Sequence, residues 1–130
     1  MARKRTAEAM IEIIDRYFDA VDAGDVEATL AVLTPDCTLT VVTDNITHKG
    51  RDSGIRRMFK RRAKNLDTAW HGNRRYVADP KTGTAATRFD VRSTFKDGGK
   101  RSMDNINFFE FRGLKLHRIS IWMSGENTLR

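Results

Sequence analysis

A carboxylate stands at the end of an apolar row near the N-terminus of the sequence. Ile14, Phe18 and Asp22 are spaced four residues apart, so a helix places their side chains in one line on its surface. An acid at a helix end is ordinarily solvated, and this interpretation of Asp22 stays open. The alternative is that the row ends at a cavity, where a carboxylate that orients an imidazole creates a general base.

Three histidines are candidates for that imidazole. His71 is one candidate partner for Asp22, and a hydrogen-bonded histidine at a strand edge is the alternative interpretation of it. His48 lies in a polar turn, and His117 alternates with isoleucines whose face is expected to point away from a pocket. Because the histidines are scattered and Cys37 is the single cysteine, we expect neither a metal site nor an internal disulfide, and no cofactor.

Length and composition indicate one globular domain. The chain has 130 residues, of which 39% are hydrophobic and 32% charged, which is enough for a substantial core. We expect residues 1–130 to form one domain with a basic tail at residues 1–5. No apolar run approaches the length of a membrane span, and no apolar segment follows the basic N-terminus as in a secretory signal. The expected location is therefore cytoplasmic, without a membrane partner.

The net charge of +7 raises the question of a nucleic-acid partner. Part of the positive charge is concentrated in the segment "IRRMFKRRAK". In a nucleic-acid-binding helix the cations should be paired with exposed aromatic side chains or with a groove-reading element, but Phe59 belongs to the apolar stripe and no aromatic residue lies between the exposed cations. We interpret the cations as a solvated helix face, and nucleic acid is not an expected partner.

The first half of the chain has the periodicity of helices. Apolar residues at helical spacing predict a helix over residues 6–21, which Ala23 and Gly24 end. Asp25 is placed to cap a short helix over residues 26–33. A third helix, which carries the basic segment, begins at Asp52 or Ser53.

The second half has the alternation of strands. A β-branched run predicts a first strand over residues 37–43. Four strand-like stretches separated by glycine- and aspartate-containing turns follow later, at residues 70–78, 84–96, 100–111 and 115–123. Helices followed by a meander of antiparallel strands predict an α+β fold in which helices cover one face of a curved sheet.

Three segments of this chain resemble the nuclear-transport-factor-2-like (NTF2-like) superfamily, in particular its SnoaL-like, ketosteroid isomerase and scytalone dehydratase-type members. The segments are "RYFDAVDAGDVEATLAVLTPDCTL", "HKGRDSGIRRMF" and "FFEFRGLKLHRISIW". The resemblance implies a cone, in which a strongly bent antiparallel or mixed sheet wraps the long first helix and leaves a pocket. It does not choose the reaction, because this fold hosts isomerases, dehydratases, cyclases, epoxide hydrolases and non-catalytic modules.

The resemblance implies catalytic roles for three residues. In the dehydratase and dehydrochlorinase branch, an aspartate at the position of Asp22 holds a histidine at the position of His71. Tyr17 matches the tyrosine that donates a hydrogen bond to a developing enolate in the ketosteroid isomerases, although a tyrosine of the buried stripe can also be plain core. Val41 and Asn107 stand where those isomerases carry their base and a second acid, so isomerisation by that route is not expected.

The alternation of the last two strands predicts which side chains line the pocket. In the strand over residues 100–111 we expect the face with Asn105, Asn107 and Phe109 to point inward. Two amides on an apolar face suggest hydrogen bonds to a ligand, and pairing with a neighbouring strand is the alternative. In the last strand the expected inward set contains Leu116, Arg118, Ser120 and Trp122. The expected substrate-binding residues are Asn105, Asn107, Arg118, Trp122, Phe18, Phe89 and Phe109.

The role of Arg118 and the identity of the outer face of the sheet both depend on the register of the last strand. Arg118 resembles a cation that assists a leaving group in the dehydrochlorinase branch, but a slip of one residue would place it on the surface. The opposite faces of the last two strands would leave an apolar outer surface, as at a partner interface. We expect a homodimer, the usual state in this superfamily, through Ile106, Phe108, Ile119, Ile121 and Met123.

These features together predict a cofactor-free enzyme of lyase or isomerase type. His71 would abstract a proton, as in dehydratases, from a small and largely apolar compound with a carbonyl or hydroxyl group. The alternative is a non-catalytic small-ligand-binding or dimerisation module of the same fold.

Overall fold

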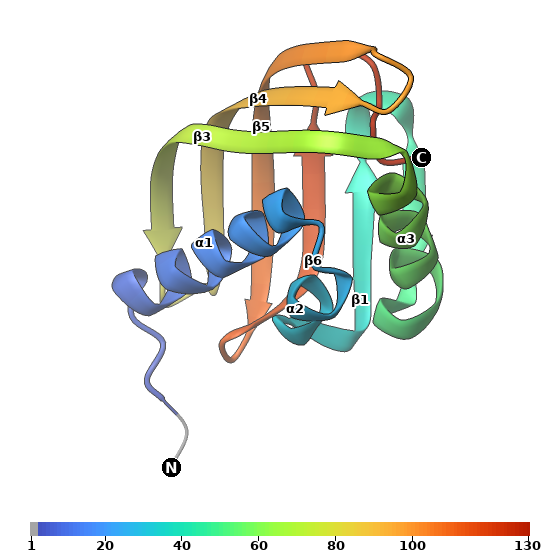
Figure 1. Ribbon diagram of the computed structural model, residues 1–130. Helices are drawn as coiled ribbons and strands as arrows, with labels where there is room; N and C mark the ends of the chain where they lie inside the picture. Colours follow the sequence, from blue (N-terminus) through green and yellow to red (C-terminus); the bar gives the residue numbers. More distant parts are fainter. Residues whose placement is uncertain (1–2) are drawn as a thin grey trace.

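The computed structural model describes residues 3–130, which form one curved six-stranded sheet with helices on its concave side (Figure 1). The strand order is β2-β1-β6-β5-β4-β3. Neighbouring strands are antiparallel except β1 and β6, which are parallel. The sheet is mixed and not closed, and α1 crosses its concave face. This arrangement confirms the predicted α+β cone.

The first two helices begin at residues with clear capping roles, whereas no side chain caps the start of the third helix, which Asp52 or Ser53 was expected to cap. In α1 (Ala7–Ala23), the Thr6 side chain accepts a hydrogen bond from the Ala9 N–H at 3.1 Å, and Gly24 ends the helix with a φ of 67°. In α2 (Val26–Ala31), Asp25 is the N-cap as expected. The basic segment forms α3 (Arg56–Asn65). Among residues 3–130, no helix has the length and apolar character needed to cross a membrane.

The four late strands are confirmed, and the early part of the sheet differs from the prediction. β4, β5 and β6 run over Thr84–Phe95, Lys100–Arg112 and Lys115–Trp122, close to the expected ranges. β3 (Leu66–Asp79) and β1 (Leu33–Val41) begin earlier than expected, because their first residues pair with Phe95 and Leu116 across the sheet. β2 (Ile46–Lys49) was not predicted, and a short 3₁₀ helix, η1 (Val42–Asp44), and a short π-helix, η2 (Gly50–Ile55), flank it.

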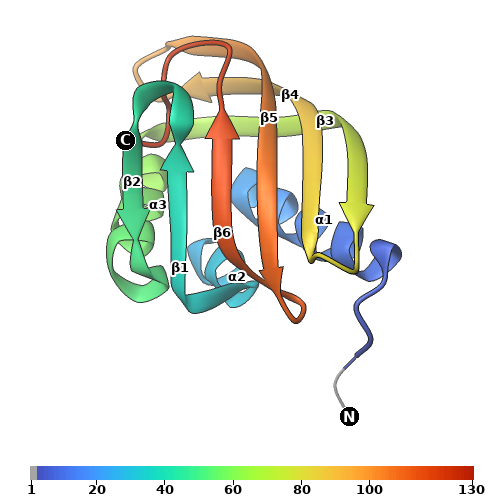
Figure 2. The ribbon, with the colours of Figure 1, turned by 180° about the vertical axis from the view of Figure 1, so that it is seen from behind.

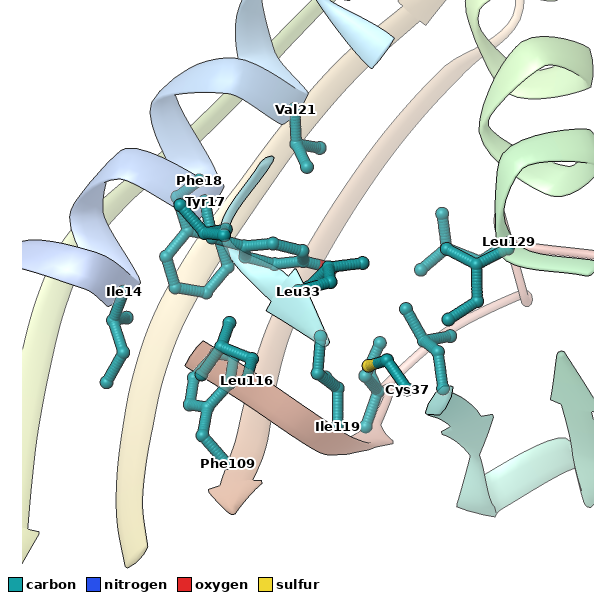
Figure 3. Packing of buried hydrophobic residues seen from close by; sticks show 14 of the residues in the cluster. Ile14, Tyr17, Phe18, Val21, Leu33, Cys37, Phe109, Leu116, Ile119 and Leu129 are labelled. Atoms are coloured by element: carbon teal, nitrogen blue, oxygen red, sulfur yellow. The ribbon is translucent and has the colours of Figure 1, made fainter. Parts of the chain in front are cut away.

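The core lies between α1 and the concave face of the sheet (Figure 3). Phe18 and Phe109 are its largest fully buried side chains, and their ring centroids lie 6.0 Å apart in an edge-to-face arrangement. Cys37 is a buried free thiol within this cluster. The side chain of Leu129, near the C-terminus, points into the same cluster (Figure 3).

The predicted inward face of β6 is wrong at three of its four positions. Leu116 is buried as expected, but the residues that follow it inward are Ile119, Ile121 and Met123. The pairing of β5 with β6 explains the change, because the register shifts between Glu110 and Phe111 and leaves one extra residue on β6. Such a bulge reverses the alternation beyond it. Arg118 and Trp122 therefore lie on the outer face, where Arg118 approaches Glu110 at 3.6 Å.

Figure 2 shows the molecule from the outer side of the sheet. This face carries a smaller apolar surface than predicted. Ile106, Phe108 and Trp122 are exposed there, and Ile106 pairs directly with Trp122. Ile119, Ile121 and Met123 belong to the core and are removed from the expected interface. A dimer through this face stays a prediction, with Trp122 in place of the three core residues.

The expected basic tail is in contact with the domain from its third residue onward. Arg3 forms an ion pair with Glu12 at 2.9 Å, and the Arg5 guanidinium donates to the carbonyl oxygen of Pro80 at 3.0 Å. The first two residues of the predicted tail lie outside the described residues. The described part of the tail is therefore tied to the end of the sheet where β3 meets β4.

Candidate functional site

Asp22 and His71 lie side by side, although 49 residues separate them in the sequence. Asp22 Oδ1 is hydrogen-bonded to His71 Nδ1, and Asp22 Oδ2 accepts the backbone N–H of His71 at 3.0 Å. Both side chains are largely buried, with exposed fractions of 19% and 12%. Since a carboxylate accepts hydrogen bonds, the Nδ1 atom carries a proton, and Nε2 of a neutral ring is left as a proton acceptor.

A bulge in β3 orients the His71 and Arg74 side chains of the site. The register between β3 and β4 shifts between Gly72 and Arg75, and Asn73 takes a φ of 52°. The shift lets His71 and Arg74 both face α1 although three positions separate them. The Arg74 Nε–H then donates to the carbonyl oxygen of His71 at 2.8 Å. Bulges of this kind frequently aim side chains at active sites.

Arg74 connects the site to a row of acids on α1. Its two terminal nitrogens donate to Asp15 at 2.9 Å and to Asp19 at 3.0 Å, and the second lies 3.7 Å from Asp22 Oδ2. The guanidinium carbon also lies 5.0 Å from the centroid of the Phe18 ring. Sequence reasoning missed Arg74, and the available signal was the spacing of Asp15, Asp19 and Asp22 on one helix face.

Aromatic rings surround the His71 imidazole on the side of the core. The Phe18 ring is stacked on it at 5.3 Å with an interplanar angle of 28°, and the Phe89 ring lies 5.5 Å away. These rings exclude water from the imidazole. Burial consequently lowers the pKa of His71 from its ordinary value of 6.5. Arg62 and Arg74 lower the pKa further and Asp22 raises it, and the balance keeps the ring neutral near pH 7.

The lowered pKa of His71 predicts that acid reduces stability through this residue. The unfolded chain binds a proton at His71 at a higher pH than the folded protein does, so stability falls as the pH drops below about 6.5. Urea unfolding of the wild type and of His71→Gln, at about pH 7.5 and about pH 5, measures this contribution. We expect the wild type to lose more free energy of unfolding than the variant. An equal loss in both proteins would contradict a buried neutral imidazole.

A small cavity adjoins the imidazole between α1, α3 and the sheet. Its volume is about 30 Å³, which is the space of about one water molecule. It is lined by Tyr17, Phe18, Val21, Phe59, Arg62, His71, Phe89, Val91, Ser93, Met103, Asn105, Asn107, Ile121, Met123, Thr128 and Leu129. A drug-sized ligand needs a pocket of about 300 Å³ or more, so this cavity is closed to it in the present conformation.

The C-terminal residues contribute to this closure. Leu129 is 8% exposed and lines the cavity, and its carbonyl oxygen is hydrogen-bonded to His48 Nε2 at 2.6 Å. Asn127 donates to Asp44 at 3.0 Å, and the Arg61 guanidinium donates to the backbone oxygen of the last residue at 3.0 Å. The prediction of a polar turn at His48 is wrong, because His48 lies on β2, where it holds the C-terminal segment (residues 127–130) that borders the cavity.

Comparison with known families identifies the family of this chain. The model of the SnoaL-like domain matches residues 14–119. The chain belongs to the SnoaL-like domain family. Its fold is the NTF2-like fold that the sequence predicted, since a solved structure described as an NTF2-like protein, from Burkholderia pseudomallei, is 13% identical with a TM-score of 0.74 over 92% of each chain. No curated protein matches the chain.

Solved structures share the fold of this SnoaL-like domain at low sequence identity. A candidate aromatic ring hydroxylase from Novosphingobium aromaticivorans is 24% identical, with a TM-score of 0.76 over 97% of this chain and 94% of that one. A candidate polyketide cyclase from Silicibacter sp. is 21% identical, with a TM-score of 0.78 over 90% of each chain. A candidate polyketide cyclase from Pseudomonas putida is 17% identical, with a TM-score of 0.78 over 91% of each chain. At these identities the likeness concerns the fold alone.

Most of the predicted site residues of this SnoaL-like domain meet around the cavity. Tyr17, Phe18, His71, Phe89, Asn105 and Asn107 line it. Asp22 lies behind the imidazole, and Phe109 packs in the core against Phe18 and Tyr17. Arg118 and Trp122 are on the outer face and do not reach the cavity, because of the bulge between β5 and β6.

The two predicted asparagines differ in their hydrogen bonding. The Asn105 Oδ1 atom accepts the backbone N–H of Ser124 at 3.1 Å, so this amide holds the segment that follows β6. The Asn107 Oδ1 atom and the Thr87 Oγ1 atom beside it in the register are buried and have no hydrogen-bond partner within residues 3–130. Buried polar atoms without partners are uncommon, and Asn107 lines the cavity. Arg62 also lines the cavity and was missed from the sequence.

Proposed function

We propose that this SnoaL-like domain is a cofactor-free lyase or isomerase in which His71 Nε2 removes a proton from a small, largely apolar carbonyl or hydroxyl compound. The observation that carries this proposal is the buried Asp22–His71 pair beside a cavity, since it leaves one imidazole nitrogen unpaired with the carboxylate. The matching solved structures described as candidate polyketide cyclases support a small-molecule enzyme at the level of the fold.

The geometry supports a short reaction sequence. His71 Nε2 takes a proton from the carbon next to a carbonyl group, and the electron pair of that C–H bond moves to the carbonyl oxygen. The Asp22 carboxylate holds the ring in orientation and stabilises the imidazolium that forms. In a dehydratase the pair of electrons then returns and expels a β-hydroxyl group, which leaves as water with the proton from His71. In an isomerase the imidazolium returns the proton to another carbon.

Substrate entry in this proposal requires the C-terminal segment, residues 127–130, to move. A cavity of about 30 Å³ holds no organic substrate, and Leu129 is the lining residue closest to the chain end. Displacement of residues 127–130 would open the space between α3 and the sheet. The polar atoms of Asn107 and Tyr17 would then face the substrate oxygen.

Deuterium exchange tests the proposed proton abstraction. In D₂O the wild type should introduce deuterium next to the carbonyl group, or eliminate water, for at least one member of a panel of small apolar ketones and β-hydroxyketones. NMR measures both reactions directly. The same panel with His117→Gln serves as a control, because His117 lies on β6 and does not line the cavity.

A second candidate function is a non-catalytic ligand-binding module. The small closed cavity favours it, because the described conformation has no room for a substrate beside His71. Binding of panel compounds without exchange or elimination above the uncatalysed rate would select this alternative and reject the enzyme.

A further inference from the structure

One arginine of the basic helix α3 is buried, in contrast to its neighbours. Arg57, Lys60, Arg61 and Lys64 are exposed, as the sequence predicted for this face. Arg62 is only 9% exposed and lies on the side of α3 that faces α1 and the sheet, where it lines the cavity with His71. The feature that needs explanation is therefore a buried cation in the wall of a cavity that no described carboxylate lines.

The described contacts of Arg62 leave its charge without a carboxylate. One terminal nitrogen donates to the carbonyl oxygen of Val21 at 3.1 Å, in the last turn of α1. Within residues 3–130 no acid lies within ion-pair distance of this guanidinium, whereas Arg56, Arg74 and Arg112 all have such partners. A guanidinium has five N–H donors, and a helix C-terminus supplies only a partial negative charge.

Burial of this cation costs free energy that its single described hydrogen bond offsets only in part. Burial lowers the pKa of Arg62, and the nearby Tyr17 and Asp22 side chains act in the opposite direction. An arginine nevertheless remains protonated in proteins, so a positive charge persists at the cavity wall. The same charge acts on His71, whose pKa it lowers. A buried charge with incomplete pairing in a cavity wall is characteristic of a binding site.

We propose that Arg62 is the anion-binding group of this pocket and that its substrates are small apolar carboxylates. The carboxylate would pair with the free N–H groups of the guanidinium, and the apolar body would lie against Phe18 and Phe89 beside His71. This inference rests on the proposed function, because it assigns a substrate class to the same pocket. The substrate would be a carbonyl or hydroxyl compound, as in that proposal, that also carries one carboxylate group.

A matched pair of probes tests the charge preference. Benzoate and benzamide have nearly the same shape and differ in charge, so we titrate both into the wild type and into Leu129→Ala and follow ligand NMR signals. Benzoate should bind at least about tenfold more tightly than benzamide, as expected for a charge-assisted hydrogen bond. Arg62→Met should bind both probes equally, and Arg62→Lys should retain part of the preference.

A control variant separates the pocket from the general positive charge of the protein. Arg57→Met removes an exposed cation from the same helix and should keep the full preference for benzoate. Arg62→Met also loses the hydrogen bond to Val21, so its folding is checked by circular dichroism; the comparison of the two probes on the wild type needs no variant.

Equal binding of both probes by the wild type and Leu129→Ala would overturn the inference, as would binding of neither. Retention of the full preference in Arg62→Met would also overturn it. Selective benzoate binding that depends on Arg62, in a protein that exchanges no protons, would support this inference and reject only the catalytic proposal.

Discussion

Replacing His71 with glutamine should reduce turnover by about 10²–10⁴-fold, the usual contribution of a general base, while the protein stays folded. The substituted amide can still donate a hydrogen bond toward Asp22, but it cannot accept a proton from a substrate carbon. The measurement is the rate of deuterium exchange or elimination for the compound that the wild type converts. We expect kcat to fall and the affinity for substrate to change little, because the aromatic wall of Phe18 and Phe89 remains.

Asp22→Asn should have an effect of similar size for a different reason. The asparagine retains one oxygen acceptor and loses the negative charge, so it satisfies only one of the two described N–H donors of His71 and no longer stabilises the imidazolium. Because Arg74 also loses a nearby charge, a decrease of about 1–2 kcal/mol in the free energy of unfolding should accompany the loss of turnover.

His117, a histidine outside the cavity, is the matched control for both variants. His117→Gln should leave turnover unchanged, since His117 lies on β6 and does not line the cavity. Wild-type turnover in both His71→Gln and Asp22→Asn would reject the proposed base, whatever the stability of the variants.

The fold could be predicted from local features of the sequence because those features agree with one another. The apolar row of α1, the glycine that ends it and the turn residues between the late strands each specify one element. The prediction of the Asp22–His71 contact, in contrast, depended on the family resemblance. No spacing rule brings together two residues separated by 49 positions, and the contact forms only when β3 curves over α1.

The errors arise where the structure departs from regular alternation. One extra residue in β6 moves Arg118 from the expected pocket to the surface and brings Ile119 into the core. A second bulge brings Arg74 onto the face of His71. Arg62 was not predicted as a pocket residue, because the neighbouring cations led to the interpretation of a solvated helix face. Only the packing of α3 shows which of these cations is buried. Bulges and packing depend on partners distant in sequence, which a local pattern does not contain.

Leu129→Ala should open the cavity to ligands. The leucine is part of the buried cluster, and its removal should lower the free energy of unfolding by about 2–3 kcal/mol. It should also raise the affinity for benzoate and benzamide by at least about tenfold, because the wild type must first leave a closed conformation. Ligand titration and urea unfolding of the same preparations measure the two effects.

Two further variants separate the opening of the pocket from a general loss of stability. Leu116→Ala removes a fully buried leucine that does not line the cavity, so it should destabilise the protein without improving ligand binding. His48→Ala keeps Leu129 but removes the partner of its carbonyl oxygen, and it should improve binding by a smaller factor than Leu129→Ala. If Leu129→Ala is destabilised but binds both probes no better than the wild type, the C-terminal segment is not the barrier to ligand entry into the cavity.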